Sequence, residues 1–236
     1  MQRMKFGELE LSVIDPHERD TRYIYDEIFV SEIYDHREMV IPRHPIVMDL
    51  GANIGIYSIW AHRRYRPRAI YCYEASPQTF AYLQDNTERL IDAEITKVHT
   101  FNRAIARAAG QELVLHQSPL ISGISTLLHR SKVGWIKELF ASGELVTHDV
   151  VTTTVSAEMR ANAITEVDLL KIDVEGYCME VLAGVGDADF PRIRNIVLEI
   201  DYTEEAGITP KAVRDVLCAK GYATDCRDLM LFAWRH

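Results

Sequence analysis

One short stretch constrains this chain more than any other. Residues 46–50 form an apolar run that ends in the pattern Asp-x-Gly-x-x-x-Gly, with Asp49, Gly51 and Gly55 at the fixed positions, and residues 54–64 continue in a helical pattern. A short, continuously apolar run is typical of a strand that is buried on both faces. Glycine, which lacks a Cβ, permits a sharp turn and a close backbone approach. The stretch therefore predicts a strand, a tight turn and a helix in direct succession.

The alternation of strands and helices continues along the chain. We expect strands at residues 69–74, 95–101, 112–116, 150–155, 167–172 and 195–200, helices after Pro77, at 177–183 and after Pro210, and a closing hairpin at 222–226 and 229–234. Such alternation predicts an α/β domain with a mostly parallel sheet, which we assign to residues 45–236. We assign residues 1–44 to an N-terminal cap, in which residues 6–14 alternate like a strand and residues 25–39 fit one or two short helices.

Polar residues stand at the ends of the expected strands. In an open parallel sheet, ligands bind at the carboxyl ends of the strands, near the point where the strand order reverses. The residues at or just after these ends are Asp49, Glu74, Asn102, Asp173 and Glu199. We therefore expect them to gather at one site.

The turn and the acid after the second strand indicate a nucleoside ligand. Glu74 is placed to accept hydrogen bonds from the 2′- and 3′-hydroxyls of a ribose. A dinucleotide-binding turn has the pattern G-x-G-x-x-G, whose middle glycine faces a pyrophosphate, but Asn53 occupies that place here. S-adenosylmethionine has a ribose and no phosphate, so it is favoured over a dinucleotide, and a dehydrogenase is disfavoured. Asp49 either attracts the ammonium of its amino-acid tail or orders the loop.

The expected cofactor site combines this turn with the other strand ends. A side-chain amide or a backbone N–H after the third strand is placed to recognise an adenine edge. The residues expected to bind the cofactor are Asp49, Gly51, Asn53, Gly55, Tyr57, Ser58, Glu74, Asn102, Ala104 and Asp173.

The segment after residue 172 carries the candidate catalytic groups. Asp173 and Glu175 stand where a substrate hydroxyl would meet the reactive methyl group, and either could orient or deprotonate that hydroxyl. The alternative is that both carboxylates only anchor the start of the following helix. Lys171, in an otherwise apolar strand, needs a partner or a path to solvent. His116, His129 and His148 are further candidates for a general base.

We expect no metal ion. If one is bound, Asp173, Glu199 and Asp201 would supply the oxygen ligands that suit Mg²⁺.

The composition excludes several function classes. The chain has 35 acidic and 26 basic residues, for a net charge of −9, and no block of Lys and Arg, which disfavours a nucleic-acid partner. No apolar run approaches the roughly 20 residues of a membrane span, and no apolar signal core stands at the N-terminus. Four cysteines without metal-site spacing indicate reduced thiols. We expect a cytoplasmic protein that contacts no membrane. A homodimer is one of the oligomeric states that the sequence allows.

The chain resembles the FkbM family of S-adenosylmethionine-dependent methyltransferases between residues 47 and 199. The resemblance rests on residues 49–58, 73–77, 102–104 and 171–176, with Leu83, Asn86 and residues 181–184 in support. It implies the class I methyltransferase fold, Rossmann-like, with a seven-stranded sheet whose last strand pair reverses direction. Two departures stand out. Cys178 replaces an acid that the family tends to carry, and Val155-Ser156 replaces a frequent Leu-Asp.

The resemblance implies methyl transfer, usually to an oxygen of a secondary metabolite or carbohydrate. We expect O-methylation of a hydroxyl on a small secondary metabolite or sugar-containing natural product, under a lid built from residues 1–44 and 118–148. The alternative is N-methylation of an amine or guanidine of a small molecule. A non-catalytic partner subunit is disfavoured by the intact segments 49–55 and 173–176.

Overall fold

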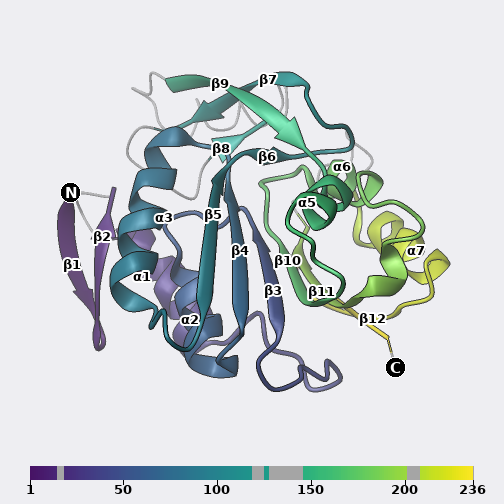
Figure 1. Cartoon of the computed structure of the whole chain (residues 1–236), viewed down its shortest axis with the longest axis horizontal. Helices are drawn as coiled ribbons and strands as arrows, with labels where there is room; N and C mark the ends of the chain where they lie inside the picture. The colour runs from purple at the N-terminus through teal and green to yellow at the C-terminus, as the bar shows by residue number, and fades with distance from the viewer. Residues whose placement is uncertain (15–18, 119–124, 128–145, 201–207, 236) are drawn as a thin grey trace.

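The fold is built on a central seven-stranded sheet with the order β12-β13-β11-β10-β3-β4-β5 (Figure 1). The computed structural model describes residues 1–14, 19–118, 125–127, 146–200 and 208–235. The strands are β3 (Ile46–Leu50), β4 (Ala69–Glu74), β5 (Lys97–Asn102), β10 (Val167–Ile172), β11 (Ile193–Glu199), β12 (Ala223–Arg227) and β13 (Met230–Trp234). Neighbours from β11 to β5 are parallel, whereas β13 is antiparallel to both β11 and β12. The expected α/β fold with its closing antiparallel hairpin is confirmed.

Helices cover both faces of this sheet because its strands are apolar on both sides. In β3, Val47 belongs to one apolar cluster, whereas Met48 and Leu50 belong to the other. The cluster around Val47 includes α2 (Ile56–Tyr65) and α3 (Pro77–Leu90). The opposite cluster includes α5 (Val155–Ala161), α6 (Cys178–Ala183) and α7 (Pro210–Ala219), and the 3₁₀ turn η2 (Phe190–Arg192) precedes β11. This layering leaves the strand ends, rather than the sheet faces, for a ligand.

The N-terminal segment differs in detail from the expectation. Instead of one strand at 6–14, it forms a hairpin of β1 (Gln2–Phe6) and β2 (Leu9–Val13), because Gly7 takes a left-handed turn with a φ of 55°. The helical part begins earlier than predicted, with α1 (Arg19–Tyr25) and the π-helical turn η1 (Asp26–Val30). Apolar residues of the hairpin and η1 join the cluster around α2. The segment is thus packed on the α2 side of the sheet.

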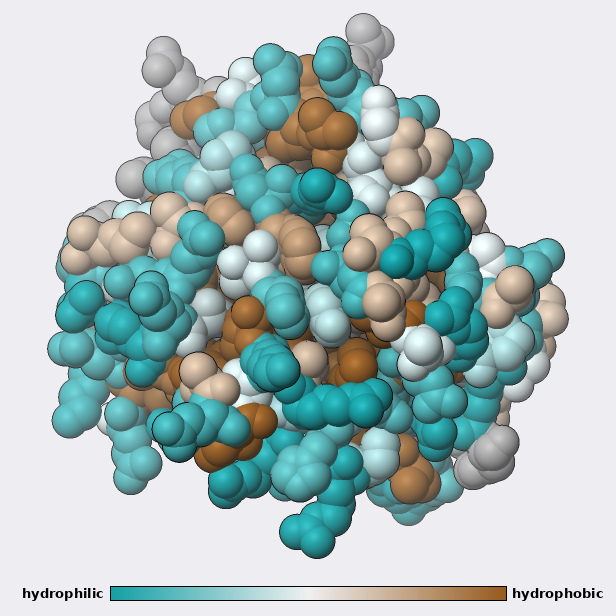
Figure 2. Space-filling model, viewed as in Figure 1, coloured by the Kyte–Doolittle hydropathy of each residue, from teal (hydrophilic) through white to brown (hydrophobic). Residues whose placement is uncertain are grey.

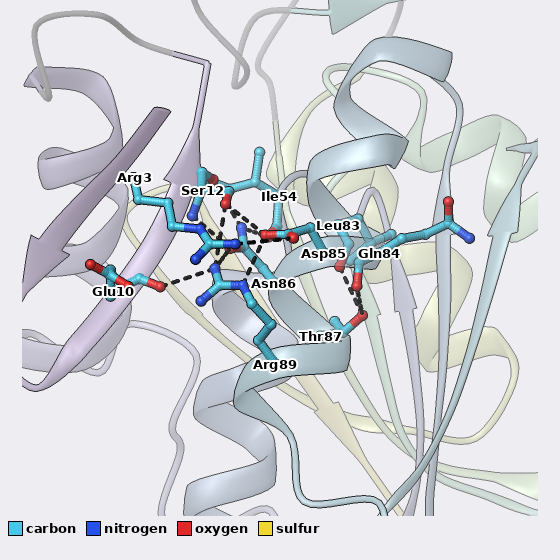
Figure 3. Close-up of polar contacts among 10 residues, drawn as sticks. All are labelled: Arg3, Glu10, Ser12, Ile54, Leu83, Gln84, Asp85, Asn86, Thr87 and Arg89. Carbon is cyan, nitrogen blue, oxygen red and sulfur yellow. Dashed lines mark hydrogen bonds and ion pairs between the residues drawn. The ribbon is translucent and has the colours of Figure 1, made fainter. Parts of the chain in front are cut away.

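A buried amide fastens the hairpin to α3 (Figure 3). The Asn86 side chain accepts a hydrogen bond from the backbone N–H of Ser12 at 2.7 Å and donates to the carbonyl oxygens of Ser12 and Ile54 at 3.0 and 2.9 Å. Asp85 and Arg89 continue the network at the surface. Because Ile54 lies in the turn after β3, one side chain connects the hairpin, α3 and that turn.

A smaller sheet, with the order β6-β9-β7-β8, lies beyond the carboxyl ends of the central strands (Figure 1). Its strands are β6 (Ala104–Ile105), β7 (Glu112–Gln117), β8 (Ser125–Thr126) and β9 (Val146–Thr153). The expected strand at 150–155 therefore begins earlier, and its end becomes the N-cap of α5. Most of the proposed lid segment 118–148 lies outside the described residues.

The face seen in Figure 2 is mainly hydrophilic, with hydrophobic residues exposed in small separate groups. Scattered groups of this kind are normal for a protein surface. Among the described helices, none combines the length and the apolar character that a membrane span requires.

The turn after β3 needs glycine because neighbouring elements close on it. At Gly51, with a φ of 73°, a Cβ would lie 1.7 Å from the backbone oxygen of Asp173. At Gly55, with a φ of 91°, a Cβ would meet the side chains of Leu83 and Thr87 on α3 at 3.0 and 3.2 Å. The close approach foreseen from the sequence is therefore made by Asp173, directly after β10, and by α3.

We expect Gly51→Ala to lower the free energy of unfolding by about 2–5 kcal/mol. A left-handed conformation costs an L-residue about 1–2 kcal/mol, and overpacking adds about 1–3 kcal/mol. Gly110→Ala is the matched control, because Gly110 has a φ of 77° and a Cβ at that position would meet no other part of the described chain within 4 Å. Urea denaturation measures both variants, and equal losses would contradict the packing argument.

Candidate active site

A cavity of about 340 Å³ opens at the carboxyl ends of β3, β4 and β10. Most of the expected site residues meet there. Those that line it are Gly51, Asn53, Tyr57, Glu74, Ala104, Asp173, Glu175 and Glu199. The cavity wall does not include the other four expected residues, which are Asp49, Gly55, Ser58 and Asn102. Asp49 contacts Lys171, which lines the cavity, and each of the other three is adjacent in sequence to a lining residue. The assignment of these residues to a cofactor stays a prediction.

Glu74 is the best-defined polar group of the cavity. Its Oε2 accepts a hydrogen bond from the backbone N–H of Asn53 at 2.9 Å, and its Oε1 accepts one from the N–H of Ser76 at 2.8 Å. Burial raises the pKa of Glu74 to about 7, although these two donors oppose the shift. A carboxylate has about four lone-pair sites, so each oxygen keeps one for a ligand.

A buried ammonium links two of the strand ends. Lys171 Nζ lies 3.1 Å from Asp49 Oδ1 and 3.3 Å from Asp173 Oδ2, and it donates to the carbonyl oxygen of Gly51 at 2.7 Å. Asp49 Oδ2 in turn accepts a hydrogen bond from Ser58 at 2.6 Å. Asp49 is fully buried, so its contacts order the loop, which is one of the two roles considered for it. Lys171 finds its partners in the two carboxylates.

Electrostatics keeps Lys171 charged. Burial alone lowers the pKa of Lys171, but the nearby carboxylates of Asp173 and Asp49 outweigh that effect and raise it above the ordinary value. The rings of Tyr34 and Tyr57 lie 5.9 and 5.6 Å from Nζ, within the range of cation–π attraction. The ammonium is therefore a fixed positive charge beneath the cavity.

Sequence analysis missed Tyr34, which comes from the N-terminal segment. Its hydroxyl donates to Asp173 Oδ2 at 3.1 Å, and burial raises the pKa of Tyr34 well above its ordinary value, so the phenol remains a donor. The contact joins residues 139 positions apart, and no local pattern indicates it.

One face of the N-terminal helical segment also lines the cavity and was not foreseen in residue detail. Its members follow the spacing i, i+3, i+4, i+7 and i+8, which is one face of a helix. They are Asp20, Tyr23, Ile24, Glu27 and Ile28. The sequence contains this spacing, but the residues at these positions are both polar and apolar, so hydrophobic periodicity does not single out the face.

The end of β5 uses its polar groups to hold the backbone. The Asn102 amide donates to the carbonyl oxygens of Glu74 and Ala75 at 2.8 and 3.0 Å. The next residue, Arg103, lines the cavity and donates to the buried carboxylate of Glu158 at 2.9 Å. The wall on this side is thus built by Ala104 and Arg103, with Asn102 behind it.

The Mg²⁺ alternative is not supported. Across the described residues, no group of three or more His, Cys, Asp and Glu side chains is arranged to hold a metal ion. Asp173 is instead held by Lys171 and Tyr34, and Asp201 lies outside the described residues. Of the candidate histidines, His116 and His148 do not line the cavity, and His129 is also outside the described residues.

Comparison with known proteins identifies the family. The model of the methyltransferase FkbM domain matches residues 49–224. The chain belongs to the FkbM methyltransferase family. It is 31% identical over 221 residues to methyltransferase sdnD of Sordaria araneosa, covering 86% of this chain and 82% of that protein. It is 28% identical over 199 residues to 31-O-demethyl-FK506 methyltransferase FkbM of Streptomyces tacrolimicus, covering 77% and 75%.

Among solved structures, a precorrin-6y C5,15-methyltransferase of Geobacter metallireducens matches with a TM-score of 0.48 and 14% identity, over 97% of this chain and 95% of that one. This FkbM-family chain is an S-adenosylmethionine-dependent methyltransferase with the class I fold, as its sheet order and family match show. The dehydrogenase alternative, which the sequence disfavoured, is therefore excluded.

We expect Lys171→Met to destabilise the protein by about 3–5 kcal/mol, because it removes the counter-charge of the fully buried Asp49 and of the partly exposed Asp173. Urea denaturation measures the loss.

Lys211→Met is the control for this variant, since Lys211 pairs with Asp215 on the exposed side of α7. Exposed pairs contribute little to stability, so this change should leave the unfolding midpoint nearly unaltered. An equal loss of stability in the two variants would argue against the buried ion pair as its cause.

Proposed function

We propose that this FkbM-family enzyme methylates a hydroxyl oxygen of a small secondary metabolite or sugar-containing natural product. The observation that carries the proposal is a single cavity lined by two carboxylates, Glu74 at the end of β4 and Asp173 directly after β10. One carboxylate suits the ribose of the methyl donor, and the other stands where an acceptor would lie. The name of the Streptomyces relative, 31-O-demethyl-FK506 methyltransferase, also supports an oxygen acceptor.

The described residues fit S-adenosylmethionine. The cavity volume lies at the lower end of the range for small-molecule sites. Glu74 keeps acceptor sites for two ribose hydroxyls, and the buried Oδ1 of Asn53 has no hydrogen-bond partner among the described residues. An orphaned acceptor at the turn suits the ammonium of the amino-acid tail. Asn53 and Glu74 would hold the cofactor, with Gly51 and Ala104 lining it.

The chain would act mainly by positioning. S-adenosylmethionine supplies a methyl group activated by its sulfonium. Glu74 fixes the ribose, and Asp173, held at Oδ2 by Lys171 and Tyr34, presents a rigid negative charge to the acceptor. Holding two reactants in line accounts for much of the rate in such a transfer. Glu175, in a left-handed conformation with a φ of 51°, lines the cavity beside Asp173 as a second acidic candidate.

N-methylation of an amine or guanidine remains the second candidate. The observation that favours it is the excess of acids in the cavity wall over the basic residues Arg103 and Lys171. The acids are Asp20, Glu27, Glu74, Asp173, Glu175 and Glu199. A negative cavity attracts a cationic acceptor.

Methyl transfer is tested with labelled S-adenosylmethionine and a panel of alcohols, sugars, glycosylated small molecules, amines and guanidines. We expect turnover of hydroxyl acceptors, with the methyl carbon of the product at an O-methyl shift in NMR. Products methylated only at nitrogen would replace the first candidate by the second. No turnover, together with no binding of S-adenosylmethionine at millimolar concentration, would overturn both.

We expect Glu74→Ala to weaken S-adenosylhomocysteine binding by about 10- to 100-fold, as loss of hydrogen bonds to a charged group implies. Because the ionised carboxylate is the better acceptor and its pKa is about 7, the affinity of the parent should rise about tenfold from pH 6 to pH 8. Calorimetry across this range measures both effects.

The control for the ribose assignment is Glu88→Ala, which removes an exposed acid of α3 outside the cavity. It should bind as the parent does and keep the same pH dependence. Affinity that stays constant or falls toward pH 8 in the parent would contradict the assigned role of Glu74.

A further inference from the structure

We propose that Glu27, supplied by the N-terminal segment, is the general base that accepts the proton of the acceptor hydroxyl, while Asp173 remains an anion that orients it. This inference rests on the proposed O-methylation. It places the general base outside residues 171–176, the segment that carries Asp173 and Glu175. Glu27 lines the same cavity as Asp173 and Glu74.

The contacts of Asp173 argue against it as the proton acceptor. Its Oδ2 lies 3.3 Å from Lys171 Nζ and accepts the Tyr34 hydroxyl at 3.1 Å. Both donors therefore occupy the same oxygen and fix the orientation of the carboxylate. A carboxylate held in this way is suited to orient a hydroxyl by accepting a hydrogen bond, rather than to remove its proton.

The surroundings of Glu27 are different. It lies on the cavity-lining face of the helical segment, between Ile24 and Ile28, and is half-buried. Burial raises its pKa, the Tyr23 hydroxyl donates to it and lowers the pKa, and the charge of Asp173 raises it again. The other titratable groups that line the cavity are Asp20, Tyr34, Tyr57, Tyr73, Glu74, Arg103, Lys171, Glu175, Tyr177 and Glu199. A base works best when its pKa lies closer to the working pH.

The backbone around Glu27 is also unusual. Residues Asp26–Val30 form a π-helical turn, in which the N–H of Ser31 bonds to the carbonyl oxygen of Asp26 at 2.8 Å. Such turns are rare and recur at functional sites, because the extra residue re-aims the side chains around it. Here the turn carries Glu27 and Ile28, both of which line the cavity.

In the proposed step, the acceptor oxygen forms a bond to the methyl carbon as the methyl–sulfur bond breaks, and the electron pair of that bond stays on the sulfur. The hydroxyl proton passes to a carboxylate oxygen of Glu27 and then to solvent. Tyr23, which is 64% exposed, is a positioning residue that holds Glu27 from the cavity mouth.

The test compares Glu27→Gln with Asp26→Asn, which removes the same charge from the neighbouring, exposed residue outside the cavity. On the hydroxyl acceptor that the parent turns over fastest in the panel, we expect kcat of Glu27→Gln to fall by about 100-fold or more. The dissociation constant of S-adenosylhomocysteine should stay within about twofold of the parent value. Glu27→Asp should recover part of kcat, and Asp26→Asn should match the parent.

A second readout does not depend on turnover. In protein labelled with ¹³C-carboxyl glutamate, the resonance that disappears in Glu27→Gln should titrate above the ordinary range of a glutamate. In Tyr23→Phe, loss of the phenol donor should move this titration, and the acid limb of the pH–rate profile, to higher pH.

The outcomes separate the two proposals. Parent-like kcat in Glu27→Gln, or an unshifted titration in Tyr23→Phe, would overturn the role of Glu27 and leave methyl transfer standing. If the parent methylates no hydroxyl acceptor, the proposed function fails and the assignment of Glu27 fails with it.

Discussion

The rest of the site depends on one buried ammonium. Lys171 lies between Asp49 and Asp173, which end or follow adjacent parallel strands, and it also binds the carbonyl oxygen of Gly51 in the turn. Without that charge, the fully buried carboxylate of Asp49 and the partly exposed carboxylate of Asp173 would lose their counter-ion. Burying an ion is costly unless it is paired and hydrogen-bonded, so the three groups require one another. The same contacts set the positions of the turn and of Asp173, both of which line the cavity.

The local parts of this arrangement could be foreseen in the sequence. The strand, turn and helix around Gly51 follow from short-range patterning, and Glu74 follows because parallel strands end at one edge of a sheet. Even here the reason differed in part. Gly51 and Gly55 were expected to admit a ligand, whereas the nearest atoms to their missing Cβ positions belong to Asp173, directly after β10, and to α3. The identity of a residue was easier to foresee than the neighbour that requires it.

Long-range contacts were beyond the sequence. Tyr34 contacts Asp173, 139 positions away in the sequence. Glu27 lines the cavity and lies in a π-helical turn that no sequence pattern predicted. Asp49 carried two alternative roles, and only its complete burial against Lys171 and Ser58 favours loop ordering. The Mg²⁺ alternative failed for a related reason. Of the acids expected to bind the ion, Asp173 is paired with Lys171 and Tyr34, and neither partner could be assigned to it from the sequence.

The cavity therefore has two halves with different physical constraints. The half at Gly51 and Glu74 is built from backbone positions that two packed elements fix, and a side chain added at Gly51 would collide with the main chain. The half formed by α1 and η1 is built from side chains on one face of a helical segment. The family model begins at residue 49, after this segment. On the proposed function, the donor half is constrained by the fold itself, whereas the acceptor half can vary side chain by side chain, and this division lets one scaffold serve different acceptors.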